Sequence, residues 1–349
     1  MLRNTKKYKG ISDSLIPKKQ YFTCINFQKI LKYSFPNISK FSSWLSSHTQ
    51  QLFFMEHKEA GGNNSERNFT TISPTAKSLL MMKGYTRLPF AAQVAGLAMR
   101  PELFEPDFQH KDFMFWTRVF HFEARYKSVD TLMQDLSIKN ILELSSGFSF
   151  RRLDKVINQE VQYIDTDLPS IVDEKKEMLD ELLTDVPIPK GNLKLLPLNA
   201  LDEKAFTTIV NHFKRGPIII LNEGLMIYLN EEEKRKLCRI IHAILKERGG
   251  YWITADIYLK PPSNIPVFKM ADDLQPLLDQ HKVNENMFES LESAANFFES
   301  EGFVIDKEAE TDYSQLDSYN YLIASASPEI LAGMGKFPKI HATWRLKAV

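Results

Sequence analysis

The stretch that most constrains the fold of this chain is residues 140–151, with the sequence NILELSSGFSFR. Ile141, Leu142 and Leu144 predict a buried strand, which runs into a tight Ser-Ser-Gly turn, and a helix is expected from about Arg151. In an α/β protein such a turn opens a crevice at the carboxyl end of the sheet, where ligands bind. Glu143 is a carboxylate within this apolar strand and needs a cationic or hydrogen-bonding partner, so it either contacts a ligand or caps a structural group.

Strands alternate with helices through the region that follows. Further strands are expected at 161–164, 193–198, 217–221 and 251–257, and helices at 170–183, 202–213 and 231–248. Asp165 and Asp167 are expected in an acid-rich turn after the second strand. Beyond residue 260 a helix at 286–300 and strands at 303–307 and 342–347 are expected. This alternation predicts an α/β fold with a doubly wound, Rossmann-like parallel sheet.

The remaining parts of the chain divide around this sheet. Residues 1–54 carry eight lysines and a single acid, Asp13, and we interpret them as a basic extension that is disordered or not native. Residues 55–349 are expected to form one domain. Within it, 70–136 form an N-terminal helical cover, and 137–349 form the α/β core with a lid insertion at about 260–300.

Composition excludes several classes of protein. Lys and Arg number 44, as do Asp and Glu, so the net charge is zero and gives no electrostatic case for nucleic-acid binding. The two cysteines, Cys24 and Cys238, lie far apart, which argues against a disulfide framework and a structural zinc site. No apolar run reaches the roughly 18 residues of a membrane span. We therefore expect no bound metal, no membrane association and a cytoplasmic location.

Acidic residues occur at the ends of three expected strands: Glu143, then Asp165 and Asp167, then Glu223. The carboxyl ends of such strands converge on one edge of the sheet, and an acid about 20 residues after the first turn commonly binds ribose hydroxyls. Both the G-x-G-x-x-G and the G-x-x-x-x-G-K-[ST] patterns are missing, which disfavours a phosphate-bearing ligand such as a nicotinamide cofactor. A cationic, phosphate-free nucleoside, S-adenosylmethionine, suits these carboxylates better.

Four segments carry a resemblance to a known family. In chain order, they are ARYKSVD at 124–130, ELSSGFSFR at 143–151, YIDTDLPSIVDEKKEML at 163–179 and NEGLMIYL at 222–229. Together they resemble the leucine carboxyl methyltransferase-like family of class I S-adenosylmethionine-dependent methyltransferases. The similarity covers roughly residues 75–260 and continues more loosely to the end.

The resemblance implies roles for individual residues at the methionyl end of the cofactor. Arg125 would pair with the cofactor carboxylate, and Lys77 would assist it. Gly147 would allow close approach of the methionyl group, while Glu143 would hold its ammonium. Glu223 would line the sulfonium end.

The resemblance also implies how the nucleoside would be held. Asp167, or Asp165 two residues earlier, would bind the ribose hydroxyls, and Asn199 and Ala200 would contact the adenine. The family's first motif usually has a glycine and an acid where this chain has Ser145 and Ser149.

The expected activity is transfer of a methyl group to oxygen of a small-molecule or carboxylate acceptor. A cofactor-binding but inactive regulatory protein of the same fold is the alternative, because the glycine turn is altered. A carboxylate acceptor needs no general base, whereas a phenol or alcohol would need one. His121 and Tyr85 lie in the helical cover, belong to no motif and are interpreted as structural, so the sequence assigns no catalytic base.

Overall fold

The structure, a computed structural model, describes residues 73–151, 153–184, 186–260, 279–333 and 339–349. The extension expected at 1–54 lies outside the described residues, as does the 261–278 part of the expected lid insertion. Among the described helices, none is both long enough and apolar enough to span a membrane.

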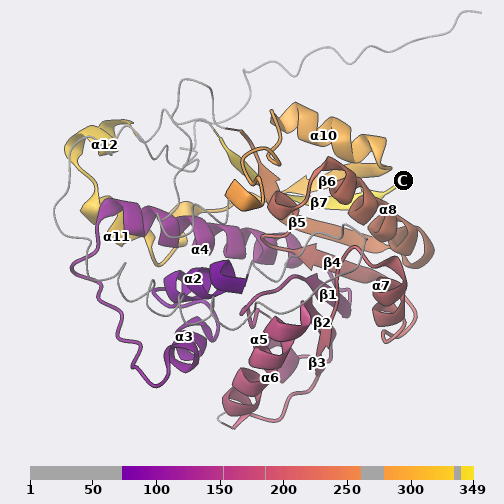
Figure 1. Cartoon of the computed structure of the whole chain (residues 1–349), viewed down its shortest axis with the longest axis horizontal. Helices are drawn as coiled ribbons and strands as arrows, with labels where there is room; N and C mark the ends of the chain where they lie inside the picture. Colours follow the sequence, from indigo (N-terminus) through magenta and orange to yellow (C-terminus); the bar gives the residue numbers. More distant parts are fainter. Residues whose placement is uncertain (1–72, 152, 185, 261–278, 334–338) are drawn as a thin grey trace, which may run out of the picture.

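A seven-stranded sheet lies at the centre of the protein, in the order β3-β2-β1-β4-β5-β7-β6 (Figure 1). The strands are β1 (Asn140–Leu144), β2 (Gln162–Asp167), β3 (Asn192–Pro197), β4 (Ile218–Asn222), β5 (Gly250–Tyr258), β6 (Phe303–Glu308) and β7 (His341–Ala348). Strands β1 to β5 pair in parallel, and β7 pairs antiparallel with both β5 and β6. The order reverses at β1, which lies between β2 and β4, and a doubly wound sheet opens its ligand crevice at such a point.

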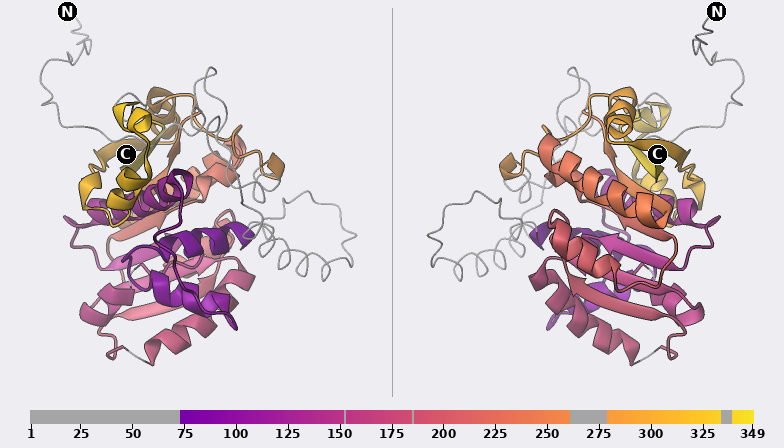
Figure 2. Two further views of the ribbon diagram at one scale, coloured as in Figure 1. Left: turned by 90° about the vertical axis from the view of Figure 1, so that its left-hand side faces the viewer. Right: turned by 90° about the vertical axis from the view of Figure 1, so that its right-hand side faces the viewer.

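Helices surround the sheet. They are α2 (Ser73–Lys83), α3 (Ala91–Met99), α4 (Phe113–Met133), α5 (Leu153–Asn158), α6 (Pro169–Leu183), α7 (Glu203–Val210), α8 (Glu231–Arg248), α10 (Leu291–Ser300), α11 (Tyr319–Ser325) and α12 (Pro328–Gly333). Two 3-10 turns, η2 (Met226–Tyr228) and η3 (Tyr313–Gln315), lie between them. In the left view of Figure 2, α2 and α3 (indigo to purple) face the viewer together with α11.

Successive side chains of β1 and β4 alternate between two hydrophobic clusters, one on each face of the sheet. Leu142, Leu144 and Ile220 pack with residues of α7, α8 and α10. On the opposite face, Ile141 and Ile219 pack with residues of α4 and α5. Apolar side chains on both faces account for the continuous apolar runs of these strands. The expected doubly wound fold with an N-terminal helical cover is confirmed.

Two expected boundaries are wrong. Strand β2 continues through Asp167, so Asp165 and Asp167 lie within the strand and not in a turn after it. The helix expected to begin at residue 286 begins at Leu291, where the side chain of Ser290 accepts a hydrogen bond from the Ser293 N–H. The cap explains this later start, because it satisfies a backbone donor that the helix leaves unpaired.

The carboxyl-terminal part of the expected lid belongs to the core. Helix α10 buries Ala294, Phe297 and Phe298 against the sheet. The Phe298 ring lies 5.4 Å from that of Trp252 and 6.1 Å from that of Trp344, centroid to centroid. The expectation of a lid over this segment is therefore corrected, since these buried aromatic contacts hold α10 in place.

We expect Phe298→Ala to lower the free energy of unfolding by about 3–5 kcal/mol, because it leaves a cavity among buried aromatic rings. Urea denaturation of the full chain measures this value. Leu331→Ala on α12, where Leu331 is 40% exposed, is the control and should change it by less than about 1 kcal/mol. Equal effects of the two substitutions would contradict the placement of α10 in the core.

Candidate functional site

A cavity of about 260 Å³ opens at the carboxyl ends of the parallel strands. Its wall is formed by the turn after β1, the ends of β2 and β3, the loop after β4, and helices α2, α3 and α4. Most of the exposed surface of this wall is apolar, as is usual for small-molecule sites.

Seven of the nine predicted cofactor residues line this one cavity. They are Arg125, Glu143, Gly147, Asp167, Asn199, Ala200 and Glu223. They come from α4, from the ends of β1 and β2, and from the segments that follow β1, β3 and β4, so the sheet brings together residues that lie far apart in the sequence.

Two predicted residues do not line the cavity. Lys77 forms an ion pair with Glu174 at 2.9 Å on the protein surface, where each side chain is about 40% exposed. Asp165 is buried, and its carboxylate binds the Lys175 ammonium at 2.6 Å and the Ser146 hydroxyl. Neither side chain lines the cavity. Lys77 is engaged with Glu174, and Asp165 with Lys175 and with Ser146, which itself lines the cavity.

The turn after β1 holds Asp167 in position. Gly147 has φ +53° and donates its N–H to one carboxylate oxygen of Asp167 at 2.7 Å, while the Leu168 N–H binds the other oxygen at 2.7 Å. Burial raises the pKa of Asp167, and these two N–H donors oppose that shift. Each carboxylate oxygen can accept more than one hydrogen bond, so the same group can also receive ligand hydroxyls.

Ser145 shows how the altered turn is accommodated. It adopts φ +48°, the left-handed conformation that glycine tolerates most easily. The serine therefore retains the backbone path of a glycine turn, at a conformational cost of roughly 1–2 kcal/mol.

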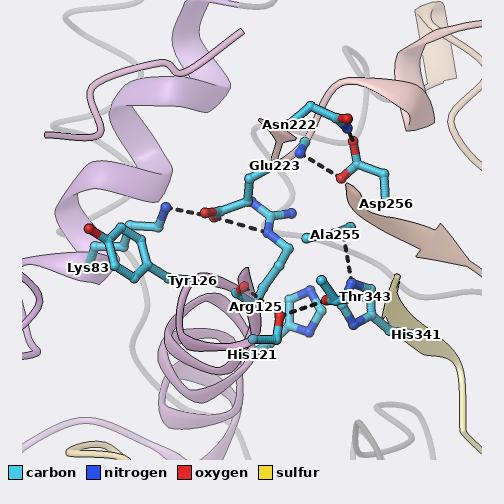
Figure 3. Close-up of polar contacts among 12 residues, drawn as sticks. Lys83, His121, Arg125, Tyr126, Asn222, Glu223, Ala255, Asp256, His341 and Thr343 are labelled. Atoms are coloured by element: carbon cyan, nitrogen blue, oxygen red, sulfur yellow. Dashed lines mark hydrogen bonds and ion pairs between the residues drawn. The ribbon is translucent and has the colours of Figure 1, made fainter. Parts of the chain in front are cut away.

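Glu223 is the point where three cations meet. Its Oε1 lies 2.7 Å from Lys83 Nζ and 3.2 Å from Arg125 Nε (Figure 3). Its Oε2 binds the Arg151 guanidinium. Burial alone would raise the pKa of Glu223, but the attraction of the three cations outweighs it and holds the pKa well below its ordinary value. Burial lowers the pKa of Lys83.

The loop that carries Glu223 is fixed by Asp256 near the end of β5. The Asp256 carboxylate accepts hydrogen bonds from the Gly224, Leu225 and Met226 N–H groups at 2.6–2.9 Å. It also accepts one from the Asn222 side chain at 2.6 Å (Figure 3). Because one carboxylate gathers three successive backbone donors, the Glu223 side chain leaves β4 in a defined direction.

Glu143 has internal partners. Its carboxylate accepts a hydrogen bond from the Tyr163 hydroxyl and lies 3.4 Å from Arg151 Nε. Burial raises the pKa of Glu143, and Arg151 opposes this shift. The two interpretations of Glu143 remain compatible, since it lines the cavity and also positions the Arg151 guanidinium.

Three residues of the cavity wall were not assigned to the site from the sequence, and one of them, His121, was interpreted as structural. Lys83 on α2, His121 on α4 and Tyr258 at the end of β5 all line it. Tyr258 could have been found by extending the strand-end argument to the fifth strand, whereas no motif marks Lys83 or His121. Among the described residues, no cluster of His, Cys, Asp and Glu suited to a metal ion occurs.

No family model matches this sequence, and no curated protein matches it. Solved structures similar to it include one described as a pericyclic reaction enzyme, at 9% identity and a TM-score of 0.38. That similarity covers 64% of this chain and 47% of the other, so the chain spans about half the length of that structure.

Two further solved structures are methyltransferases. Magnesium protoporphyrin IX methyltransferase (ChlM) from Synechocystis PCC 6803 with bound SAH has 10% identity and a TM-score of 0.40, over 78% of this chain and 100% of that one. The S-adenosylmethionine-dependent methyltransferase SibL has 12% identity and a TM-score of 0.37, over 72% of this chain and 60% of that one. These similarities are too distant to assign an activity, so the functional argument rests on the cavity itself.

We expect Glu223→Gln to destabilise the full chain by about 3–5 kcal/mol at neutral pH, because it leaves three cations without their shared anion. The folded-state pKa of Glu223 is depressed, so its contribution is present above the unfolded-state value near 4.5 and is lost as pH falls below it. Urea denaturation should therefore show the gap between wild type and variant narrowing toward acid pH. Glu289→Gln, at a surface pair where Glu289 is 72% exposed, is the control and should have little effect. A gap that stays constant with pH would contradict the account.

Substitutions at Ser145 test the left-handed turn. Ser145→Val should lower the free energy of unfolding by about 1–3 kcal/mol, because a β-branched side chain tolerates this conformation poorly. Ser145→Gly should leave it within about 1 kcal/mol of wild type. Chemical denaturation of both variants measures the difference, and equal stability of the two would count against the observed backbone conformation.

Proposed function

We propose that this protein is an S-adenosylmethionine-dependent O-methyltransferase of the class I type, related to the leucine carboxyl methyltransferase-like family. The observation that carries the proposal is the convergence of seven of the nine predicted cofactor residues on one cavity at the switch point of the sheet. Residues that the resemblance selected from separate segments thus line one cavity, which supports the proposal.

The polar groups of the cavity suit each part of this cofactor. Asp167 would accept the ribose hydroxyls, and Asn199 and Ala200 would lie beside the adenine. Lys83 and Arg125 share a single oxygen of Glu223, so both can also bind the cofactor carboxylate. Glu143, Asp167 and Glu223 on the same wall disfavour a phosphate-bearing ligand.

The backbone also leaves room for the methionyl group. A Cβ atom added to Gly147 would have one neighbouring atom within 4 Å, the Cβ of Ala76 at 3.5 Å. The cavity in front of Gly147 is therefore open. The bound cofactor supplies an electrophilic methyl group, and the main task of the protein is to hold the acceptor oxygen in line with it. The acceptor is a small molecule or a carboxylate.

Isothermal titration calorimetry with S-adenosylmethionine tests the proposal, using two lysines on the same helix. Lys83→Met should weaken binding about 10- to 100-fold, because it removes a charge-assisted hydrogen bond worth roughly 1.5–3 kcal/mol. Lys77→Met is the matched control and should leave affinity unchanged, because Lys77 faces the surface. Asp167→Asn should weaken binding over a similar range.

Two outcomes would contradict the proposal or narrow it. A folded wild-type protein that does not bind S-adenosylmethionine would overturn it. Binding without any methyl transfer to a broad acceptor panel would favour the inactive regulatory alternative. That alternative is motivated by Ser145 and Ser149 in the turn.

A further inference from the structure

The cavity extends beyond the residues assigned to the cofactor. In the order β3-β2-β1-β4-β5, the proposed ribose and adenine contacts lie at the ends of β2 and β3. Tyr258 lies at the end of β5, on the other side of β4. The part of the cavity near β5 is therefore available for the methyl acceptor.

Apolar side chains form the wall at this second end. Leu225 and Ile227 after β4, together with Val283, Met287 and Ile340, line it. An acceptor bound there would place an apolar body against these residues, since burial of apolar surface is the main source of affinity in such a pocket.

Two polar side chains of this part of the wall, His121 and Tyr258, are hydrogen-bonded to each other. His121 Nε2 lies 2.9 Å from the Tyr258 hydroxyl, and Arg125 Nη1 donates to the same hydroxyl at 2.9 Å. A guanidinium can only donate, so the Tyr258 oxygen is the acceptor in that contact. The Tyr258 O–H can then donate to His121 Nε2, which identifies this nitrogen as the proton-accepting one.

The groups around His121 keep its ring neutral. Burial lowers the pKa of His121 well below its ordinary value, and His341 from β7 and Arg125 from α4 lower it further. Glu223, after β4, acts in the opposite direction but does not outweigh these effects. His121 is therefore without a second proton before the reaction and can receive one through the tyrosine oxygen. The same groups make it a weak base, so this proton transfer is favourable only together with the loss of the positive charge on the sulfonium.

We propose that the acceptor is a phenol with an apolar body, and that the Tyr258–His121 pair removes its hydroxyl proton during methyl transfer. This inference rests on the proposed function. A carboxylate acceptor is already ionised at neutral pH and would need no such pair. A phenol has a pKa of about 10, similar to that of tyrosine, so exchange of a proton between the two oxygens costs little.

The step balances in atoms and charge. The acceptor oxygen forms a bond to the methyl group as the carbon–sulfur bond breaks, and the electron pair of that bond stays on sulfur. The acceptor proton passes to the Tyr258 oxygen, and the Tyr258 proton passes to His121 Nε2. Because the positive charge that leaves sulfur reappears on the imidazole, the net charge of the cavity does not change.

The test uses 4-nitrophenol as a probe, whose ionisation is followed by absorbance, bound to the full chain with S-adenosylhomocysteine present. The probe should bind to wild type. The apparent pKa of bound 4-nitrophenol should be about one unit higher in Tyr258→Phe and in His121→Asn than in wild type. One unit is a tenfold change in the ionisation equilibrium. Tyr321→Phe is the control, because its ring stacks on Trp116 outside the cavity, and it should match wild type.

The possible results separate the two proposals. Three results would overturn the phenol assignment. They are failure of 4-nitrophenol to bind, an equal apparent pKa of the bound probe in wild type and both variants, and stronger binding of 4-nitrobenzoate than of 4-nitrophenol. Calorimetry with S-adenosylhomocysteine on the same samples reports cofactor binding separately. Cofactor binding together with one of these failures removes only the further inference, whereas absence of cofactor binding removes the proposed function as well. Thermal melts verify that each variant is folded. If one variant does not fold, the comparison of the other with wild type is sufficient for the test.

Discussion

The arrangement of the cavity depends on one buried carboxylate, that of Glu223. Lys83 from α2, Arg125 from α4 and Arg151 after the β1 turn all contact it. Three segments separated in the sequence are thus held around the residue that follows β4. A buried carboxylate without partners would be costly, and so would three buried cations without an anion, so each side of the cluster stabilises the other. The cluster fixes the helical cover relative to the sheet and leaves Lys83 and Arg125 on the cavity wall.

The other strand-end carboxylates have structural partners, and two of them, Glu143 and Asp167, also line the cavity. Asp167 accepts hydrogen bonds from two backbone N–H groups, and Asp256 accepts them from the loop after β4. Glu143 accepts hydrogen bonds from Arg151 and Tyr163. Each of these partners orients the carboxylate before any ligand arrives. A site built in this way loses little conformational freedom on binding, which favours affinity.

Sequence reasoning reached the fold because the apolar runs and the capping residues are local signals. Asn230 and Glu233 form a capping box at the start of α8, whose helix was expected at 231–248, and the strands lie within a few residues of their expected positions. Most of the residues that the strand-end argument selected line one cavity, because parallel strands bring their carboxyl ends to one edge. Asp165 shows where this argument stops. It lies on the same face of β2 as Asp167 but two residues deeper, where Lys175 reaches it.

The residues of the helical cover that line the cavity could not be predicted from the sequence, for a different reason. Lys77 and Lys83 lie six residues apart on α2, which places them on different sides of the helix. Their spacing does not say which of the two sides faces the sheet, and only the packing of α2 against α3 and α4 decides it. The contact between His121 and Tyr258 joins positions 137 residues apart, so no local pattern could indicate it.

The most direct test of the account is a crystal structure of the full chain with S-adenosylhomocysteine. The account predicts that the ribose hydroxyls lie within hydrogen-bond distance of the Asp167 carboxylate, and that the amino-acid carboxylate contacts Lys83 or Arg125. A nucleoside bound elsewhere on the protein, or bound in the cavity with its ribose turned away from Asp167, would contradict it.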